Sequence, residues 1–278
     1  MERKILWLIS FAVIFILWLK VGPLQNSADL ASTKTEPSVI VSGETNNSAT
    51  PPKTKDKSLT SSNNEAKNMP DNALLEEEED SYFDAHPIVN AAPDFAAITD
   101  VKQRKEAFFS YLSPFIEEKN NLLLKDRHQL QQILDNKEPP SREEKRWLKA
   151  LRDIFKLPKT DVYTHGVISE LFLYVDIIPQ SLVLAQAANE SAWGTSRFAT
   201  EGNNYFGQWC FRKGCGLVPE ARDDDADHEV RRFKDARKSV FAYIDNLNIN
   251  PAYRSLRESR AELRQQNKEI TGLILAQG

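Results

Sequence analysis

The most pronounced hydrophobic pattern in this chain is a nearly continuous apolar run from Ile5 to Leu19, which follows the basic residues Arg3 and Lys4. A basic start and an apolar core are typical of a secretory signal sequence. No small-x-small triplet with a good cleavage context stands between Val21 and Ser32, so we expect residues 1–24 to stay as a signal anchor rather than be cleaved. Because the basic residues remain in the cytoplasm, the rest of the chain is expected in the periplasm, tethered to the inner membrane.

Residues 25–81 form a polar stretch that is rich in Ser, Thr, Asn, Pro and Lys. Such a sequence buries too little apolar surface to offset the entropy lost on ordering. The acidic run Glu76–Asp80 near its end is of a kind that is usually solvated. We therefore expect a disordered linker that carries no site and lets a domain reach well away from the membrane.

Helical periodicity dominates residues 82–158. Asp100 is a candidate N-cap, and apolar residues follow it at helical spacing. A second helix is expected over Leu122–Leu134. Ser141 and Glu144 then have the spacing of a capping box, which begins a further helix.

Residues 159–278 mix helical and strand patterns. Pro179 begins a helix that is expected to end near Gly194, a residue type that favours helix C-termini. Two short strands, Leu217-Val218 and residues 229–233, are joined by an acidic turn, and helical spacing then returns. The pattern predicts a mainly α fold with one small β-hairpin lobe.

Composition narrows the class of partner. The chain has 278 residues and a net charge of −4, with 41% hydrophobic and 27% charged residues. A nucleic-acid-binding protein normally shows a basic face, so we expect no nucleic-acid partner. A neutral or acidic groove is compatible with a carbohydrate polymer without requiring one.

The two cysteines, Cys210 and Cys215, lie within one short segment. They can close a small disulfide loop in an oxidising compartment, or remain free thiols in the cytosol, and the export signal favours the disulfide. Two cysteines supply only half the ligands of a structural zinc site, and the four histidines are scattered. We therefore expect no metal.

The segment Leu184–Ser196 carries the most informative chemistry. Glu190 follows Gln186 by four residues, so the two share one helix face. Glu190 also falls in the last turn of its predicted helix, where carbonyl ends disfavour an ionised carboxylate, and Trp193 offers apolar surface nearby. Both effects raise a carboxyl pKa, which suits a general acid that protonates a glycosidic oxygen. From spacing alone, the commoner interpretation is a solvated surface glutamate.

The residues around Glu190 resemble the signature of the glucosaminidase family of lysozyme-like enzymes. The matching residues are Ala185-Gln186, Glu190-Ser191, Trp193-Gly194-x-Ser196 and Asn203-Asn204-Tyr205-Phe206-Gly207. Further similar segments are Val230–Phe233, Ser239-Val240 and Asn250–Tyr253. The likeness is greatest to the bacterial Bax-type subfamily, where it includes Pro93-Asp94-Phe95 and the cysteine loop and covers roughly residues 87–278.

This resemblance implies a lysozyme-like fold in which the β-hairpin lobe forms one wall of a glycan cleft. It also implies cleavage of the peptidoglycan glycan strand after N-acetylglucosamine, with Glu190 as the catalytic acid. The residues that it implies for the cleft are Gln186, Trp193, Ser196, Asn203, Asn204 and Phe206, and Tyr253 is a candidate beside them. Plainer roles stay open: Trp193 and Phe206 as core residues, the two asparagines as turn formers, and Ser196 as a cap.

The sequence leaves the second catalytic group open. The family often places a second acid in the hairpin lobe, where the candidates are Glu220, Asp225 and Glu229. Its distance from Glu190 would distinguish retention from inversion, and the substrate's own 2-acetamido group could replace it as the nucleophile. The acidic run 223–227 lacks the Gly and distal Glu of a calcium loop, so we expect no cofactor.

Proteins of the family that this chain resembles normally continue past the position of Gly278 with a further helix, so we expect either a truncated gene or a sequence that is a fragment. Three functions remain: a glycan hydrolase that uses Glu190, a lytic transglycosylase, and a non-catalytic, membrane-tethered peptidoglycan-binding protein. The Trp193-Gly194-x-Ser196 pattern favours the hydrolase, and the retained motif around Glu190 argues against the binding protein. The expected partners are peptidoglycan strands and the inner membrane, and the sequence identifies no protein partner.

Overall fold

The protein is represented by a computed structural model. The residues that it describes are 81–88, 91–219 and 228–277. The chain divides into two units, residues 1–61 and 62–278, and every described residue belongs to the second. The predicted signal anchor and nearly all of the predicted linker lie outside the described residues and stay predictions. Within the described part of the chain, no helix combines the length and the apolar character that a membrane crossing requires.

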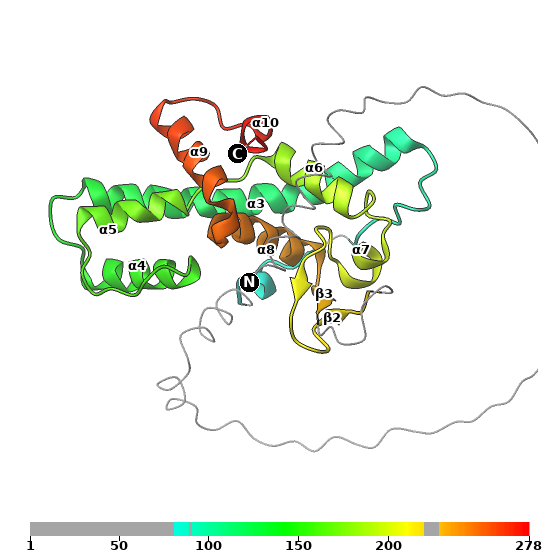
Figure 1. Cartoon of the computed structure of the whole chain (residues 1–278), viewed down its shortest axis with the longest axis horizontal. Coiled ribbons are helices and arrows are strands. Elements are labelled where there is room, and N and C mark those ends of the chain that lie inside the picture. The colour runs from blue at the N-terminus through cyan, green and yellow to red at the C-terminus, as the bar shows by residue number, and fades with distance from the viewer. Residues whose placement is uncertain (1–80, 89–90, 220–227, 278) are drawn as a thin grey trace, which may run out of the picture. The chain divides into compact units, whose positions relative to one another are not determined.

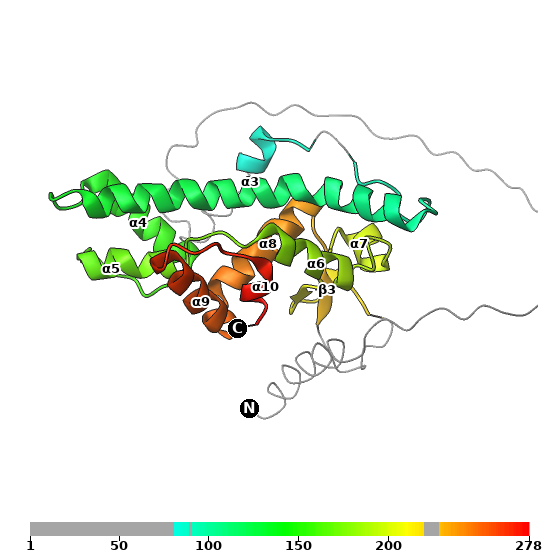
Figure 2. The same cartoon turned by 90° about the horizontal axis from the view of Figure 1, so that it is seen from above.

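One long helix, α3 (Val101–Asp135), forms the support for the rest of the domain, and the other helices lie along it (Figures 1 and 2). Asp100 caps it as predicted, because its carboxylate accepts a hydrogen bond of 2.8 Å from the backbone N of Gln103. The prediction of a separate helix beginning near Leu122 was wrong, since α3 is continuous through that position.

The continuity of α3 is notable because Pro114 lies inside it. An internal proline removes a backbone hydrogen bond and costs about 3 kcal/mol or more. Leu112 and Ile116, on either side, are fully buried in the core. Burial of two such side chains contributes about 3–6 kcal/mol, which is enough to hold the helix together.

The shorter elements are distributed along α3. These are α4 (Arg142–Ile154), α5 (His165–Ser169), η2 (Glu170–Leu173), α6 (Gln180–Glu190), α7 (Arg197–Gly202), α8 (Ala236–Ile249), η3 (Pro251–Tyr253), α9 (Arg254–Gln265) and α10 (Gly272–Leu275). The helices α4 and α5 lie at one end of α3, whereas α6, α7 and the sheet lie towards the other (Figure 1). The predicted capping box at the start of α4 is present, with Ser141 and Glu144 each bonding the other's backbone N.

A single hydrophobic core joins the two predicted parts of the domain, 82–158 and 159–278. The helix α3 packs against both α6 and α8. Buried residues that meet in this core include Phe108 and Leu112 from α3, Val183 and Ala187 from α6, and Val240 and Ile244 from α8. Because α6 carries Glu190 and α8 carries residues beside it, this shared core fixes the geometry of the candidate site.

The small sheet is antiparallel, with the strand order β1-β3-β2. Its strands are β1 (Trp209–Cys210), β2 (Gly216–Leu217) and β3 (Glu229–Arg231). The pairing of β2 with β3 confirms the predicted hairpin, in the register Leu217 opposite Val230. Strand β1, which pairs Trp209 with Val230, was missed because a two-residue strand is too short to show alternation. The fold is therefore mainly α with a small β lobe, as predicted.

A buried ionic network ties α9 to the segment that leads into α6. Asp176 is 1% exposed and accepts hydrogen bonds of 2.7 and 3.0 Å from Arg264. Arg260, also 1% exposed, donates to Asn248 Oδ1 at 2.7 Å and to the carbonyl of Ile177 at 2.9 Å. Burial alone would raise the pKa of Asp176, but the bond from Arg264 and the nearby guanidinium charges hold it below the usual value.

Candidate active site

Glu190 is the last residue of α6, and the chain turns sharply after it. Ala192, Trp193 and Gly194 all have left-handed backbone angles, with φ of 49°, 60° and 79°. The helix therefore ends four residues before the predicted end at Gly194. A Cβ at Gly194 would come within 2.4 Å of the Phe95 ring, so this position requires glycine.

Ser191 holds this turn in place. Its side chain is fully buried. The hydroxyl donates to the carbonyl of Ala187 at 2.6 Å and accepts from the backbone N of Gly194 at 2.8 Å. The Glu-Ser pair of the motif thus combines a candidate acid with the residue that fixes the end of its helix.

The carboxyl group of Glu190 lies in a partly buried setting. Gln186 Nε2 donates to Glu190 Oε1 at 2.9 Å, as the four-residue spacing predicted. Gly207 lies on the other side, where an added Cβ would be 3.5 Å from Glu190 Oε2. Burial raises the pKa of Glu190 above its usual value, which is the direction that a general acid requires.

Two tyrosines belong to the same environment. Burial, followed by the negative charge of Glu190, raises the pKa of Tyr253. Burial, followed by Tyr253 and Glu190, raises the pKa of Tyr243. Tyr253 was a sequence-based candidate, whereas Tyr243 was not. A tyrosine on an otherwise aliphatic helix face was the signal that could have identified it.

Phe206 contributes to the site through Tyr243. The two rings stack with centroids 4.1 Å apart and an angle of 5° between their planes. Phe206 is only 7% exposed. It therefore acts as a packing residue that positions the Tyr243 ring, which matches the core role left open for it.

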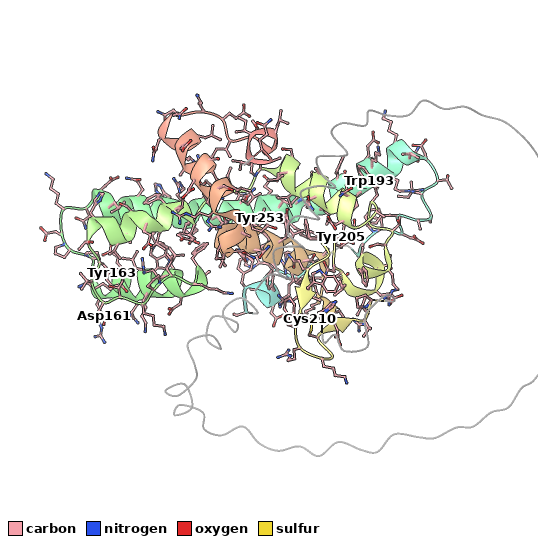
Figure 3. The ribbon with its side chains drawn as sticks, viewed as in Figure 1. Asp161, Tyr163, Trp193, Tyr205, Cys210 and Tyr253 are labelled. Carbon is pink, nitrogen blue, oxygen red and sulfur yellow. A yellow bond between two sulfur atoms is a disulfide. The ribbon has the colours of Figure 1, made fainter. Side chains whose placement is uncertain are left out.

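Trp193 packs away from this group, against α3 (Figure 3). Its ring meets Phe108 and Phe109 edge-on at centroid distances of 5.7 and 5.4 Å, and Lys105 Nζ lies 4.7 Å from its centroid. The left-handed turn after Glu190 directs the indole to α3. Tyr243 and Tyr253, rather than Trp193, are the aromatic residues near Glu190. Trp193 packs as a core residue, one of the two roles that the sequence left open for it.

The segment Asn203–Gly207 is a junction between α3, α7, α8 and the sheet. Asn204 is 1% exposed, and its Nδ2 donates to the carbonyls of Gln208 and Arg231 at 2.9 and 2.8 Å. Asn203 has a left-handed backbone, and its side chain bonds the carbonyls of Phe233 and Lys234. These bonds place Gly207 beside Glu190 and support the turn-forming role for both asparagines.

Ser196 caps α7, because its hydroxyl accepts a hydrogen bond of 3.2 Å from the backbone N of Ala199. This is the plainer of the two roles considered for it.

The β lobe carries the disulfide predicted between Cys210 and Cys215. Glu229, which pairs opposite Cys210 in the sheet, is 3% exposed, and its two carboxylate oxygens accept from the backbone N of Gly214 and of Gly216, both at 2.8 Å. These bonds stabilise the disulfide loop, so the geometry favours a structural role for Glu229 over that of a second acid. The other two candidates, Glu220 and Asp225, lie outside the described residues.

Cys210, Cys215 and Glu229 also lie close enough together to resemble a metal site. The disulfide leaves no thiolate to bind an ion, and both oxygens of Glu229 bond to backbone amides. We assign no metal to this group.

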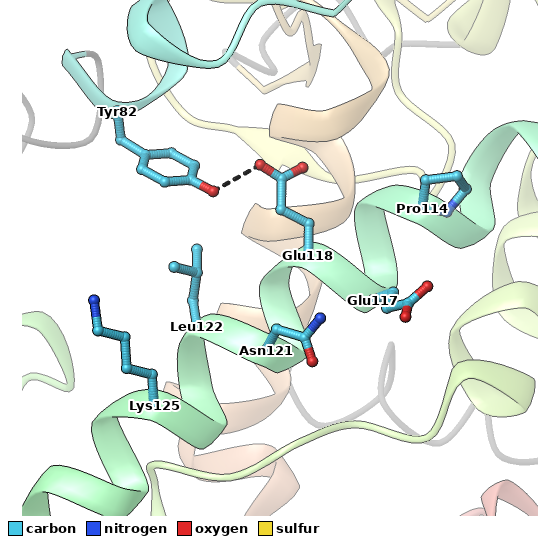
Figure 4. Close-up of a pocket in the computed structure, with 7 residues that line it drawn as sticks. All are labelled: Tyr82, Pro114, Glu117, Glu118, Asn121, Leu122 and Lys125. Atoms are coloured by element: carbon cyan, nitrogen blue, oxygen red, sulfur yellow. Dashed lines mark hydrogen bonds between the residues drawn. The ribbon is translucent and has the colours of Figure 1, made fainter.

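A hollow of about 490 Å³ lies away from Glu190, between Tyr82 and α3 (Figure 4). The Tyr82 hydroxyl donates to Glu118 Oε1 at 2.8 Å, and burial, with this bond, raises the pKa of Tyr82 to about 12. None of the candidate site residues lines this hollow. The hydrogen bond from Tyr82 to Glu118 holds the helical turn at residues 81–85 on α3.

These features define a lysozyme-like, mainly α domain with a partly buried acid at a helix end, next to a small β lobe. Residues 173–275 match the family model described as "Mannosyl-glycoprotein endo-beta-N-acetylglucosaminidase". The chain is also 33% identical over 188 residues to "Protein bax" of Escherichia coli (strain K12). That match covers 67% of this chain and 66% of the relative, slightly less than two thirds of its length.

The chain belongs to the glucosaminidase family and is a Bax-type member of it. No solved structure matches it.

Proposed function

We propose that this protein is a peptidoglycan hydrolase that cleaves the glycan strand after N-acetylglucosamine, with Glu190 as the general acid. The observation that carries the proposal is the setting of Glu190, where burial raises its pKa while Gln186 fixes one carboxyl oxygen. A carboxyl group with a raised pKa keeps its proton to higher pH and can give it to a glycosidic oxygen as the bond to the sugar breaks.

The second half of the reaction needs a nucleophile at the anomeric carbon. Both oxygens of Glu229 are engaged by backbone amides, so we propose the substrate's 2-acetamido oxygen for this step, a route that needs no second carboxylate. Water then opens the intermediate, and Glu190, now ionised, accepts the proton from that water. Tyr243 and Tyr253 lie close enough to this carboxyl group for its charge to raise their pKa values.

The test compares the full chain, purified in detergent, with its Glu190→Gln variant on purified peptidoglycan. Glu262→Gln is the matched control, because Glu262 is exposed on α9 and away from the site. Removing a general acid typically costs about 10²–10⁴-fold in rate, so Glu190→Gln should lose most activity while the control retains it. Released fragments are reduced with borohydride and identified by mass spectrometry.

Fragments with a new reducing N-acetylglucosamine end, absent with Glu190→Gln, support the proposal. Anhydro-sugar ends would assign the protein to the lytic transglycosylases instead. Glycan binding without any release, in both the wild type and the variant, would favour the non-catalytic peptidoglycan-binding protein.

We also propose that residues 1–24 anchor the chain in the inner membrane with its domain in the periplasm. The support is the basic and apolar pattern of this segment together with the Cys210–Cys215 disulfide, since disulfides persist in oxidising compartments. A fusion of alkaline phosphatase to the C-terminus should be active in cells and sediment with membranes. An inactive fusion, or one released into the soluble fraction, would contradict the proposal.

A further inference from the structure

A basic hollow of about 710 Å³ lies on the β lobe. Its lining includes Arg212, Arg231, Arg232 and Lys234, and among the described residues no aspartate or glutamate lines it. This is unexpected in a chain whose net charge is −4. Concentrated positive charge of this kind attracts anionic groups.

Within the part of the chain that the structure describes, most of this charge has no carboxylate partner. Lys234 lies 3.3 Å from Asp84, and both side chains are exposed. Among the residues that the structure describes, no carboxylate pairs with Arg212, Arg231 or Arg232. All three arginines are exposed. The guanidinium of Arg231 lies over the Phe233 ring, with 4.8 Å between Cζ and the ring centroid. This position leaves the N–H groups of Arg231 available to bond a carboxylate in the plane of the guanidinium.

The wall of the hollow is held rigidly. The disulfide joins Cys210 to Cys215 across the loop that carries Arg212. Glu229 fixes the same loop by bonding the backbone N of Gly214 and Gly216. Trp209, on β1, adds an aromatic ring that is 42% exposed. The cations are therefore presented on a constrained surface rather than on a free loop, which lowers the entropy cost of binding.

The hollow is linked to the surroundings of Glu190 through Gly207. Gly207 lies beside Glu190, and Trp209 follows two residues later, a span of at most about 7 Å. Asn204 also bonds the backbone carbonyl of Arg231 at 2.8 Å. A group carried by a sugar bound at Glu190 can therefore reach the basic hollow.

We propose that the basic hollow binds the carboxylates of the peptide attached to the glycan strand. This inference rests on the proposed function, which places the glycan strand at Glu190. It adds that the peptide on the strand helps to select the bond that is cleaved. In peptidoglycan the sugar next to N-acetylglucosamine bears a short acidic peptide, and bidentate bonding to carboxylates is what arginine does best. The protein therefore prefers strands that still carry their peptides over strands from which the peptides have been removed.

The first test measures binding without turnover. The full-length Glu190→Gln protein is titrated with a disaccharide that carries an alanyl-glutamyl-diaminopimelate peptide, and with the same compound after its carboxylates are amidated. Adding Arg231→Gln and Arg232→Gln should weaken binding of the acidic compound at least about tenfold. Each charge-assisted hydrogen bond that is lost accounts for a factor of about ten or more in the dissociation constant. Arg142→Gln with Arg146→Gln, exposed on α4, changes the net charge equally and should have no effect.

Equal binding of the acidic and amidated compounds would overturn the inference. So would an equal loss of inorganic phosphate binding and peptide binding in the double variant, because the hollow would then be a general anion site. If the double variant instead lost binding to mixed micelles of phosphatidylglycerol and kept binding to the acidic compound, the hollow would be a lipid headgroup site.

The second test uses the active protein. Wild type should cleave peptide-bearing strands about tenfold faster than strands stripped by an amidase, and Arg231→Gln with Arg232→Gln should remove this preference. Cleavage of both substrates at one rate by wild type would overturn the inference and leave the proposed function intact. If no strand were cleaved, the binding test alone would decide the inference, because it does not require catalysis.

Discussion

Gln186 Nε2 donates a hydrogen bond of 2.9 Å to Glu190 Oε1, one helical turn further along α6. The bond orients the carboxyl group and also stabilises its ionised form, because the amide N–H is a donor. Burial acts in the opposite sense and raises the pKa of Glu190. The burial of Glu190 and its hydrogen bond with Gln186 therefore act on its pKa in opposite directions, and each can be changed separately.

Replacing Gln186 with methionine removes the donor and keeps a side chain of similar size. Because the lost bond favoured the carboxylate, the pKa of Glu190 should rise further. For a general acid, activity is lost as pH rises through this pKa, so the alkaline limb of the rate profile should move to higher pH. Rates of peptidoglycan cleavage over a range of pH measure this. An alkaline limb that moved to lower pH would contradict the assignment.

Glu190→Gln should also change stability in a pH-dependent way. Below the ordinary glutamate pKa of about 4.3, Glu190 is protonated in both the folded and the unfolded chain, so the variant and the wild type should be equally stable. Between that value and the raised pKa in the folded protein, the unfolded chain ionises more readily, and the wild type loses stability relative to the variant. Urea unfolding at pH 4 and pH 7 should show the variant more stable only at pH 7. A variant less stable at pH 7 would indicate a structural role for the carboxylate.

Asn204→Ala should destabilise the domain by about 2–6 kcal/mol, because two buried backbone carbonyls lose a partner at a cost of about 1–3 kcal/mol each. The variant leaves the carbonyls of Gln208 and Arg231 without the donor that they have in the wild type. Asn121→Ala, at an exposed position on α3, is the control and should change stability by less than about 0.5 kcal/mol. Chemical denaturation of both variants measures the difference, and similar values would show that the junction at Asn204 contributes little.

Changing both Cys210 and Cys215 to serine should cost about 2 kcal/mol, the value expected for closing such a short loop in the unfolded chain. Because the loop also supports the basic hollow, binding of the acidic disaccharide peptide should weaken as well. Thermal unfolding of the double variant measures the loss of stability, and titration with the acidic disaccharide peptide measures the loss of binding. Glu229 is left unchanged in this variant. Unchanged stability would show that the bonds from Glu229 hold the loop by themselves.

Tyr253→Phe removes only a hydroxyl beside Glu190, so stability should change by less than about 0.5 kcal/mol. Activity should fall about tenfold, as expected when one polar contact to the reacting group or substrate is lost. Tyr163→Phe is the matched control, because Tyr163 lies apart from Tyr253, at the end of the domain that carries α4 and α5 (Figure 3). Equal activities of the two variants would remove Tyr253 from the site.

The sequence alone determined the features that depend on neighbours in the chain. The caps at Asp100 and Ser141, the facing of Gln186 and Glu190, and the pairing of Cys210 with Cys215 all follow from short spacings. The motif around Glu190 also identified the family. In each case the interacting groups are separated by a few residues, so their spacing in the chain is enough to predict that they meet.

Only the tertiary structure decided which distant residues meet. Stacking of Phe206 on Tyr243, packing of Trp193 on Phe108 and bonding of Glu229 to the disulfide loop all depend on how whole elements pack. The continuity of α3 through Pro114 has the same origin, because burial of its neighbours outweighs a local preference. Hydrophobic burial is not directional, so a sequence pattern shows that a side chain is buried but not which residue it will contact.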